Sequence, residues 1–220
     1  MSYPLIFHDV KQNDPEWFKL KAGKISASNM KHVMAHYGKQ FGEPAKRYAK
    51  KLALEQITGE YIRDEYHNSA MDRGHVDEPI ATSLYESETF TTVLKDGIYI
   101  SDDLAYSPDG RLFFNEETGR FKSGIEIKSR NYDTHYNNIS RGGLPPEDKW
   151  QCISGLKFSG FESLDFISYC DAFPGSSKLF IHTITPDMFD LEFSQIDERL
   201  EQFKNLISDT KKVILHAMNN

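Results

Sequence analysis

The sequence lacks the features that mark zinc-binding, secreted and membrane-spanning proteins. Its only two cysteines, Cys152 and Cys170, fall in different expected elements without the paired spacing of a zinc site, which favours buried free thiols. No apolar run is long enough to cross a bilayer, and residues 1–10 lack the basic and apolar segments of a secretion signal. These absences predict a cytoplasmic protein, located in the host cytoplasm if the chain is encoded by a phage.

Positive charge is also scarce, because 26 Lys and Arg residues face 33 Asp and Glu residues and give a net charge of -7. An enzyme acting on nucleic acid needs Lys and Arg to neutralise phosphates. The basic residues do cluster, one group comprising Lys19, Lys21, Lys24 and Lys31 and the other Lys46, Arg47, Lys50 and Lys51. Solvated helix faces are the alternative interpretation of both groups. Charge therefore permits nucleic-acid binding without indicating it.

The chain has enough apolar and aromatic residues for a packed core, with 39% hydrophobic residues, 15 Phe and 11 Tyr. Its length fits one domain over residues 1–220. Hydrophobic periodicity and turn residues predict helices at about 14–23, from 29, and at 44–59, 76–86, 147–158 and 194–216. They predict strands at 90–94, 97–100, 104–107, 111–114, 124–129, 164–169 and 178–184. This order predicts an α/β fold with a mixed central β-sheet flanked by α-helices.

Local residue patterns predict where two of the helices begin and which side chains they bury. Pro79 is tolerable only in a first helical turn, which would place Glu78 near the start of its helix. The apolar face of this helix, expected at about 76–86, would consist of Val76, Ile80 and Leu84. In the last helix, Ser194 with Asp197 resembles a capping box ahead of the stripe Ile196, Leu200, Phe203, Ile207 and Ile214.

The chemistry is concentrated in Ser107-Pro108-Asp109-Gly110 and in the later Ile125-Glu126-Ile127-Lys128. Alternate side chains of a strand share a face, so Glu126 and Lys128 should project together while the isoleucines enter the core. A hairpin strand ending at Asp109 would bring a second carboxylate beside Glu126. The alternative is a surface turn at Asp109 and an exposed Glu126-Lys128 ladder on an edge strand.

Two carboxylates and an ammonium group suit phosphodiester hydrolysis. Carboxylate oxygens bind Mg²⁺ while leaving several waters on the ion. The ion neutralises the scissile phosphate and acidifies a bound water. Lys128 can orient that water or stabilise the charge of the transition state.

The order of five motifs resembles the lambda exonuclease, or YqaJ-like viral recombinase, branch of the PD-(D/E)XK nuclease superfamily. The matching segments are Trp17 to Lys21 with Ile25-Ser26-Ala27-Ser28, Gly74 to Glu78, Ser107 to Gly110, Glu126 with Lys128, and Gln151. The resemblance implies a restriction-endonuclease-like fold and Mg²⁺ as cofactor, with Mn²⁺ as an alternative and two ions per active site. It implies that Asp109, Glu126 and the Ile127 carbonyl bind metal and that Glu78 supports the second ion. Lys128 and Gln151 would position the nucleophile.

The same resemblance implies an exonuclease that digests one strand of double-stranded DNA from its 5′ end. It would release mononucleotides and leave 3′ overhangs for annealing-type recombination, as a homotrimeric ring with a single-strand annealing protein as partner. Lys21, Ser28 and Ser107 would hold the terminal 5′-phosphate, and Trp17 would either stack on the DNA end or belong to the core. Two positions depart from the family: Lys21 stands where the well-studied member has arginine, and Ile153 replaces a second glutamine.

Three alternatives remain open from the sequence. One is a structure- or sequence-specific endonuclease on the same fold, and another is a catalytically inactive DNA-binding protein. The third concerns His32 and His36, whose spacing on a helix could hold zinc but which lack a third ligand.

Overall fold

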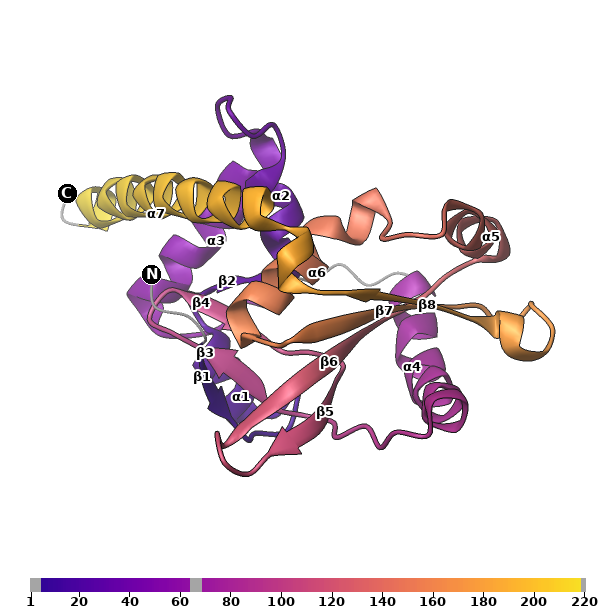
Figure 1. Cartoon of the computed structure of the whole chain (residues 1–220). Coiled ribbons are helices and arrows are strands. Elements are labelled where there is room, and N and C mark those ends of the chain that lie inside the picture. The colour runs from indigo at the N-terminus through magenta and orange to yellow at the C-terminus, as the bar shows by residue number, and fades with distance from the viewer. Residues whose placement is uncertain (1–4, 64–68, 219–220) are drawn as a thin grey trace.

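Two four-stranded β-sheets form the centre of the molecule, and helices pack around them (Figure 1). The computed structural model describes residues 5–63 and 69–218. The helices are α1 Pro15–Lys21, α2 Met30–Met34, α3 Glu43–Thr58, α4 Ser69–Thr89, α5 Tyr132–Arg141, α6 Pro146–Ser159 and α7 Asp190–Met218. The strands are β1 Ile6–His8, β2 Ile25–Ser26, β3 Ile98–Ile100, β4 Leu104–Tyr106, β5 Gly110–Asn115, β6 Arg120–Ser129, β7 Ser163–Tyr169 and β8 Leu179–Ile184.

The larger sheet has the order β5-β6-β7-β8 and mixes the two strand directions. β5 and β6 form an antiparallel hairpin, β6 and β7 run parallel, and β8 returns antiparallel to β7. The parallel pair requires a crossover, which α5 and α6 provide. In Figure 1, α4 lies below this sheet and α5, α6 and α7 lie above it. The predicted α/β class with mixed strands flanked by helices is therefore confirmed, although the strands divide into two sheets.

The smaller sheet, β1-β3-β4-β2, positions the N-terminal part of the chain beside the larger sheet. β2 pairs parallel with β4 through Ile25 and Leu104. A single 3₁₀ turn, Ala27–Asn29, then leads into α2. The segment that carries Ser26 and Ser28 is consequently fixed by a sheet on one side and a helix on the other.

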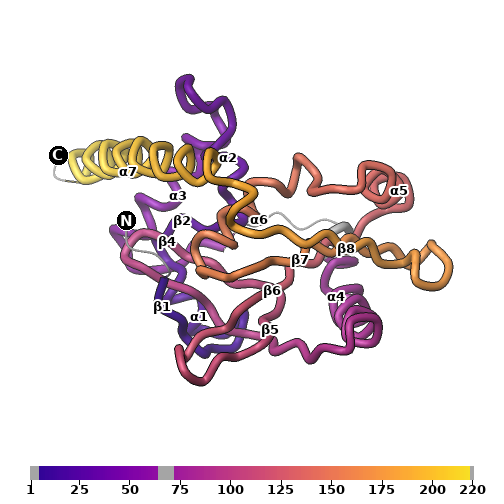
Figure 2. Tube along the Cα trace, in the orientation of Figure 1, coloured from indigo at the N-terminus to yellow at the C-terminus, as the bar shows by residue number. Residues whose placement is uncertain are grey.

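The main core includes the contact between α7 and α3, and α3 lies next to α7 in the tube view (Figure 2). The expected stripe on α7 is confirmed, because Ile196, Leu200 and Phe203 are fully buried, Ile207 is buried, and Ile214 packs against the same cluster. Phe203 stacks on Tyr48 of α3 with ring centroids 5.7 Å apart. Burial of one face per helix explains why both segments are helical.

Helix α4 differs from its prediction. It begins at Ser69, so Pro79 lies inside the helix and Glu78 lies in its middle instead of near its start. The expected core residues Val76 and Ile80 are 67% and 47% exposed, and Ala81 and Tyr85 are buried in their place. Packing of α4 on β6 outweighs the backbone hydrogen bond that the proline removes.

Other elements also depart from the sequence pattern. The capping box at Ser194 is wrong, because α7 begins at Asp190 and the Ser194 hydroxyl donates to the Asp190 carbonyl. The expected strand 90–94 is reduced to a bridge between Leu94 and Arg111, and Phe90 is 94% exposed. β1, β2 and α5 were not predicted. Asn131 caps α5 by accepting from the Thr134 amide. Residue patterns miss such short elements because few of their side chains enter the core.

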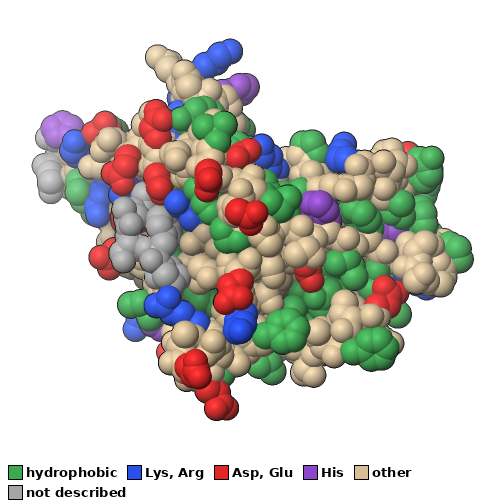
Figure 3. Space-filling model, viewed as in Figure 1, with side chains coloured by type: hydrophobic (Ala, Val, Ile, Leu, Met, Phe, Trp, Pro, Cys, Tyr) green, Lys and Arg blue, Asp and Glu red, His purple; other side chains and the backbone are tan. Residues whose placement is uncertain are grey.

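The two cysteines are free and buried, as predicted. Across the described residues, no helix is long and apolar enough to cross a membrane. The view in Figure 3 shows acidic and basic side chains mixed along α7, while hydrophobic side chains are exposed at the lower edge and the right-hand end.

Candidate active site

Strand β6 supplies the central carboxylate and the ammonium group of the site. Glu126 is only 1% exposed, and Ile125 and Ile127 on either side are buried. The Lys128 Nζ donates to Glu126 Oε1 at 2.7 Å, which confirms that the two side chains project together. The alternative of an exposed Glu-Lys ladder on an edge strand is wrong, because Glu126 is buried and β6 lies between β5 and β7. The ion pair with Lys128 offsets the desolvation of the buried carboxylate.

Asp109 joins Glu126 through the start of β5. Its backbone amide donates to the Ile125 carbonyl at 3.2 Å, and its Oδ2 accepts from the Ile127 amide at 2.6 Å. The expected geometry needs one correction, since the partner strand begins at Gly110 and does not end at Asp109. Gly110 is required there, because a Cβ would lie 2.2 Å from Val93 Cγ1.

Gln151 reaches the same carboxylate from helix α6. Its Nε2 donates to Glu126 Oε1, so its amide lies within the carboxylate cluster. An ion pair between Arg130 and Asp148 ties the first turn of α6 to the residue just beyond β6. This pair was not predicted from the sequence. The available signal was its spacing, with Arg130 two residues after Lys128 and Asp148 three before Gln151.

Glu78 stands at the edge of the cluster. Its Oε1 accepts from Lys95 Nζ at 3.0 Å, and it does not line the pocket formed by the other four predicted catalytic residues. Its charge nevertheless acts on the site, because it contributes to raising the pKa of both Asp109 and Glu126. The Lys95 partner was not anticipated from the sequence.

The electrostatics of the cluster are those of crowded carboxylates. Burial raises the pKa of Asp109 well above its usual range, and the neighbouring Glu126 charge adds to this effect. Burial also raises the pKa of Glu126, against the opposing effect of Lys128. Burial alone would lower the pKa of Lys128, but the Glu126 and Asp109 carboxylates outweigh it and raise that pKa. The site therefore favours a protonated lysine and gains from any further positive charge.

The donor set fits a hard divalent cation. Glu126 Oε2 is buried and has no hydrogen-bond partner among the described residues, so this oxygen is available to a ligand. Within the described part of the chain, no three His, Cys, Asp or Glu side chains gather into a complete metal site. Two carboxylates supplemented by a backbone carbonyl and water match the coordination that Mg²⁺ prefers. The zinc alternative at His32 and His36 gains no support, because no third ligand joins them.

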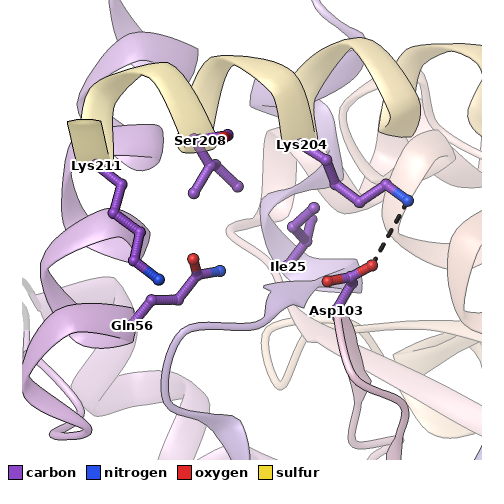
Figure 4. A pocket seen from close by; sticks show the side chains of 7 residues that line it. Ile25, Gln56, Asp103, Lys204, Ser208 and Lys211 are labelled. Atoms are coloured by element: carbon purple, nitrogen blue, oxygen red, sulfur yellow. Dashed lines mark ion pairs between the residues drawn. The ribbon is translucent and has the colours of Figure 1, made fainter. Parts of the chain in front are cut away.

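One pocket of about 150 Å³ joins this cluster to the residues expected to hold a terminal phosphate. Asp109, Glu126, Lys128 and Gln151 line one part, and Trp17, Lys21, Ser28 and Ser107 line another. The structure thus brings together every predicted site residue except Glu78 and Ile127 in a single lining. A separate hollow between α3 and α7 (Figure 4) shares none of these residues and contains the Lys204–Asp103 ion pair.

Trp17 organises the phosphate end of the pocket. Trp17 is 4% exposed and packs with Ile98 and Ala105, which favours the core interpretation over stacking on DNA. Its Nε1 donates to Ser107 Oγ at 3.3 Å, and Lys21 Nζ lies 4.2 Å from the ring centroid. The buried tryptophan therefore positions a hydroxyl and an ammonium group at the pocket surface.

This arrangement, with a Pro-Asp turn, a Glu-X-Lys strand inside the larger sheet and a glutamine from α6, defines a PD-(D/E)XK-like nuclease fold. The chain belongs to the YqaJ-like viral recombinase domain family, whose model matches residues 16–162. No curated protein matches the sequence.

Solved structures agree with the family. An alkaline exonuclease, LHK-Exo, from Laribacter hongkongensis is 27% identical, with a TM-score of 0.77 over 94% of this chain and 99% of its own. The same protein in complex with dAMP gives 28% identity, a TM-score of 0.77 and the same coverage. A phage-related exonuclease from Haemophilus somnus 129PT, at 12% identity, TM-score 0.62, and coverage of 89% and 96%, supports the fold alone.

Proposed function

We propose that this protein is a Mg²⁺-dependent DNA exonuclease that acts on the ends of double-stranded DNA in the 5′-to-3′ direction. It would release 5′-mononucleotides and leave 3′ single-stranded overhangs for annealing-type recombination. The observation that carries the proposal is the single pocket in which a carboxylate-lysine cluster adjoins a lysine-serine subsite. Membership of a viral recombinase family and similarity to an alkaline exonuclease support the same class of activity.

Each residue of the carboxylate-lysine cluster would have its own role in phosphodiester hydrolysis. Asp109 and Glu126, with the Ile127 carbonyl, would hold Mg²⁺, which when bound neutralises phosphate charge and acidifies a water molecule. Glu126 keeps Lys128 protonated at 2.7 Å, so that the ammonium group can donate to the attacking water or to a phosphate oxygen. Gln151 fixes the orientation of the Glu126 carboxylate through its amide. Glu78, released from Lys95, would support a second ion.

The terminal phosphate would bind between Lys21, Ser28 and Ser107. Lys21 provides a point charge there, and Ser28 lies 3.1 Å from Ser26 Oγ in a hydroxyl cluster. The Ser107 hydroxyl donates to the Gly97 carbonyl at 2.8 Å, so it must redirect that donor to bind a phosphate. A subsite of this kind next to the carboxylates would count nucleotides from an end, which favours an exonuclease.

The proposal includes an oligomer, because a chain with a net charge of -7 must concentrate its basic residues to bind DNA. A homotrimeric ring would gather the basic residues around duplex DNA. Its functional partner would be a single-strand annealing protein. Mn²⁺ would be able to replace Mg²⁺ as the cofactor. Hydrophobic side chains exposed outside the site, Phe113 and Phe114 of β5 among them, are available for contacts between subunits.

End-labelled DNA tests the proposal directly. A linear duplex with a 5′-phosphate should lose its 5′ label as mononucleotide in Mg²⁺ and remain intact in EDTA. A closed circular duplex should survive, whereas cleavage of the circle would identify the endonuclease alternative. DNA binding without cleavage of any substrate would identify the inactive DNA-binding alternative.

A further inference from the structure

Helix α4 carries a cation beside the carboxylate cluster that has no part in the proposed hydrolysis. Arg73 is exposed, and its Nε donates to Ser129 Oγ at 3.1 Å. Ser129 follows Lys128 directly and is the last residue of β6. Within the described part of the chain, Arg73 forms no ion pair, and its Nη1 and Nη2 groups donate no hydrogen bond. Most of the guanidinium group is therefore available to a ligand at the end of β6.

Neighbouring contacts hold the base of this guanidinium group in place. The Ser129 hydroxyl accepts from Arg73 and donates to Asp77 Oδ2, which lies one helical turn along α4 from Arg73. The packing of α4 on β6, with Ala81 and Tyr85 buried, fixes the two elements that carry these hydrogen bonds. An arginine anchored through Nε keeps its planar pair of Nη groups free, and that pair matches the oxygens of a phosphate group.

The charge of Arg73 is not neutralised by a direct partner. Two other cations near the carboxylate cluster, Lys95 and Arg130, each form an ion pair with a carboxylate. The Asp77 carboxylate accepts from the Ser129 hydroxyl and forms no ion pair with Arg73 among the residues that the structure describes. Arg73 therefore offers an anion a positive charge that is not already paired.

Arg73 and the proposed phosphate subsite lie on different sides of the carboxylate cluster. Lys21 comes from α1, which contacts β3 of the smaller sheet, whereas Arg73 comes from α4, which contacts β6 of the larger sheet. These two helices lie on different sides of β6 in Figure 1. With the terminal 5′-phosphate beside Lys21 and the scissile phosphate at Asp109 and Glu126, the remaining strand would leave the cluster on the α4 side.

Resting on the proposed function, we propose that Arg73 binds the phosphate that follows the scissile one in the digested strand. One nucleotide then lies between the 5′-phosphate subsite and the scissile bond, and the next phosphate is held on Arg73. After a mononucleotide is released, the strand moves by one nucleotide, so the phosphate held on Arg73 becomes the next scissile phosphate. Arg73 is thus a substrate-binding residue separate from the proposed metal ligands.

A neutral linkage in the DNA tests this inference against the charge of the residue. One blunt duplex with a labelled 5′-phosphate has only phosphodiester linkages. A second carries an uncharged methylphosphonate at the second internucleotide linkage of the labelled strand, and a third carries it in the middle of the duplex. Affinities in EDTA across salt concentrations would be measured for the wild type, Arg73→Ala and the control Arg120→Ala, which removes an exposed arginine at the opposite end of β6. Circular dichroism verifies that each variant folds.

We expect Arg73→Ala to bind the phosphodiester duplex about tenfold more weakly, as the loss of a charged hydrogen bond predicts, with a salt slope shallower by about 0.9. The neutral second linkage should weaken wild-type binding by a similar factor and leave Arg73→Ala unchanged, because that variant has already lost the contact. The linkage in the middle of the duplex should affect both proteins equally, and Arg120→Ala should match the wild type on every duplex. Equal effects of the second linkage on the wild type and Arg73→Ala, or equal losses in the two arginine variants, would overturn the inference.

Digestion of the same duplexes in Mg²⁺ separates this inference from the proposed function. The wild type should release the labelled mononucleotide from the phosphodiester duplex, and Arg73→Ala should release it more slowly. If the wild type digests this duplex but the second linkage shows no coupling to Arg73, only the inference fails. If the wild type releases no 5′ nucleotide, the proposed function fails and the inference fails with it.

Discussion

Replacing Asp109 by asparagine should stabilise the metal-free protein while removing its response to Mg²⁺. Asp109 Oδ2 accepts from the Ile127 amide at 2.6 Å, and an asparagine oxygen can keep that bond. What the substitution removes is a buried charge whose pKa is raised by burial and by Glu126. Relief of such functional strain is commonly worth about 1 kcal/mol, which raises the melting temperature of a chain of this size by about 2–4 °C.

The pH dependence of this gain follows from the direction of the pKa shift. A carboxyl with a raised pKa in the folded state holds its proton more tightly there than in the unfolded chain. Wild-type stability therefore falls as the pH rises above the ordinary carboxyl value and through the raised one. The advantage of Asp109→Asn should be present at neutral pH and disappear below about pH 4, where both proteins carry a neutral group.

Metal binding adds the opposite effect to the wild type. At a Mg²⁺ concentration about 100 times the Kd, the wild type should gain about 2.7 kcal/mol, or about 5–11 °C in melting temperature. Thermal melts at several pH values, with EDTA or Mg²⁺, measure both effects, and Asp102→Asn is the control for an exposed carboxylate. The reasoning would be refuted if Asp109→Asn melted like the wild type in EDTA and still gained the full shift in Mg²⁺.

Three further results are expected. Lys128→Ala should reduce exonuclease turnover by about 100-fold or more while DNA binding persists, because it removes a charge aimed at the reacting phosphate; a rate near that of the wild type would reject its role. Lys21→Ala should slow digestion of 5′-phosphorylated ends more than 5′-hydroxyl ends, and an equal loss on both would remove it from the phosphate subsite. Phe203→Ala should lower the free energy of unfolding by about 3–5 kcal/mol, since Phe203 is fully buried between α7 and α3, and denaturant titration showing a loss below about 1 kcal/mol would contradict that core.

The sequence alone predicted which residues gather at the candidate site and which face of the last helix is buried. The alternation in Ile125-Glu126-Ile127-Lys128 correctly paired Glu126 with Lys128, and the stripe containing Phe203 correctly identified the buried face of the last helix. These predictions succeeded because side-chain direction in a strand or helix follows from local backbone geometry. The fold class and the family followed from the same motifs.

The tertiary structure decided how those residues are placed. Glu126 is buried, Asp109 is fixed by the Ile127 amide, and Glu78 lies in mid-helix beside Lys95, because each depends on a partner distant in the sequence. The same holds for the Arg130–Asp148 pair that positions α6 and for the hydrogen bond from the Ser26 amide to the Tyr48 hydroxyl of α3. Local pattern has no access to contacts between separate elements, and packing energy between them can outweigh a local rule, as it does at Pro79.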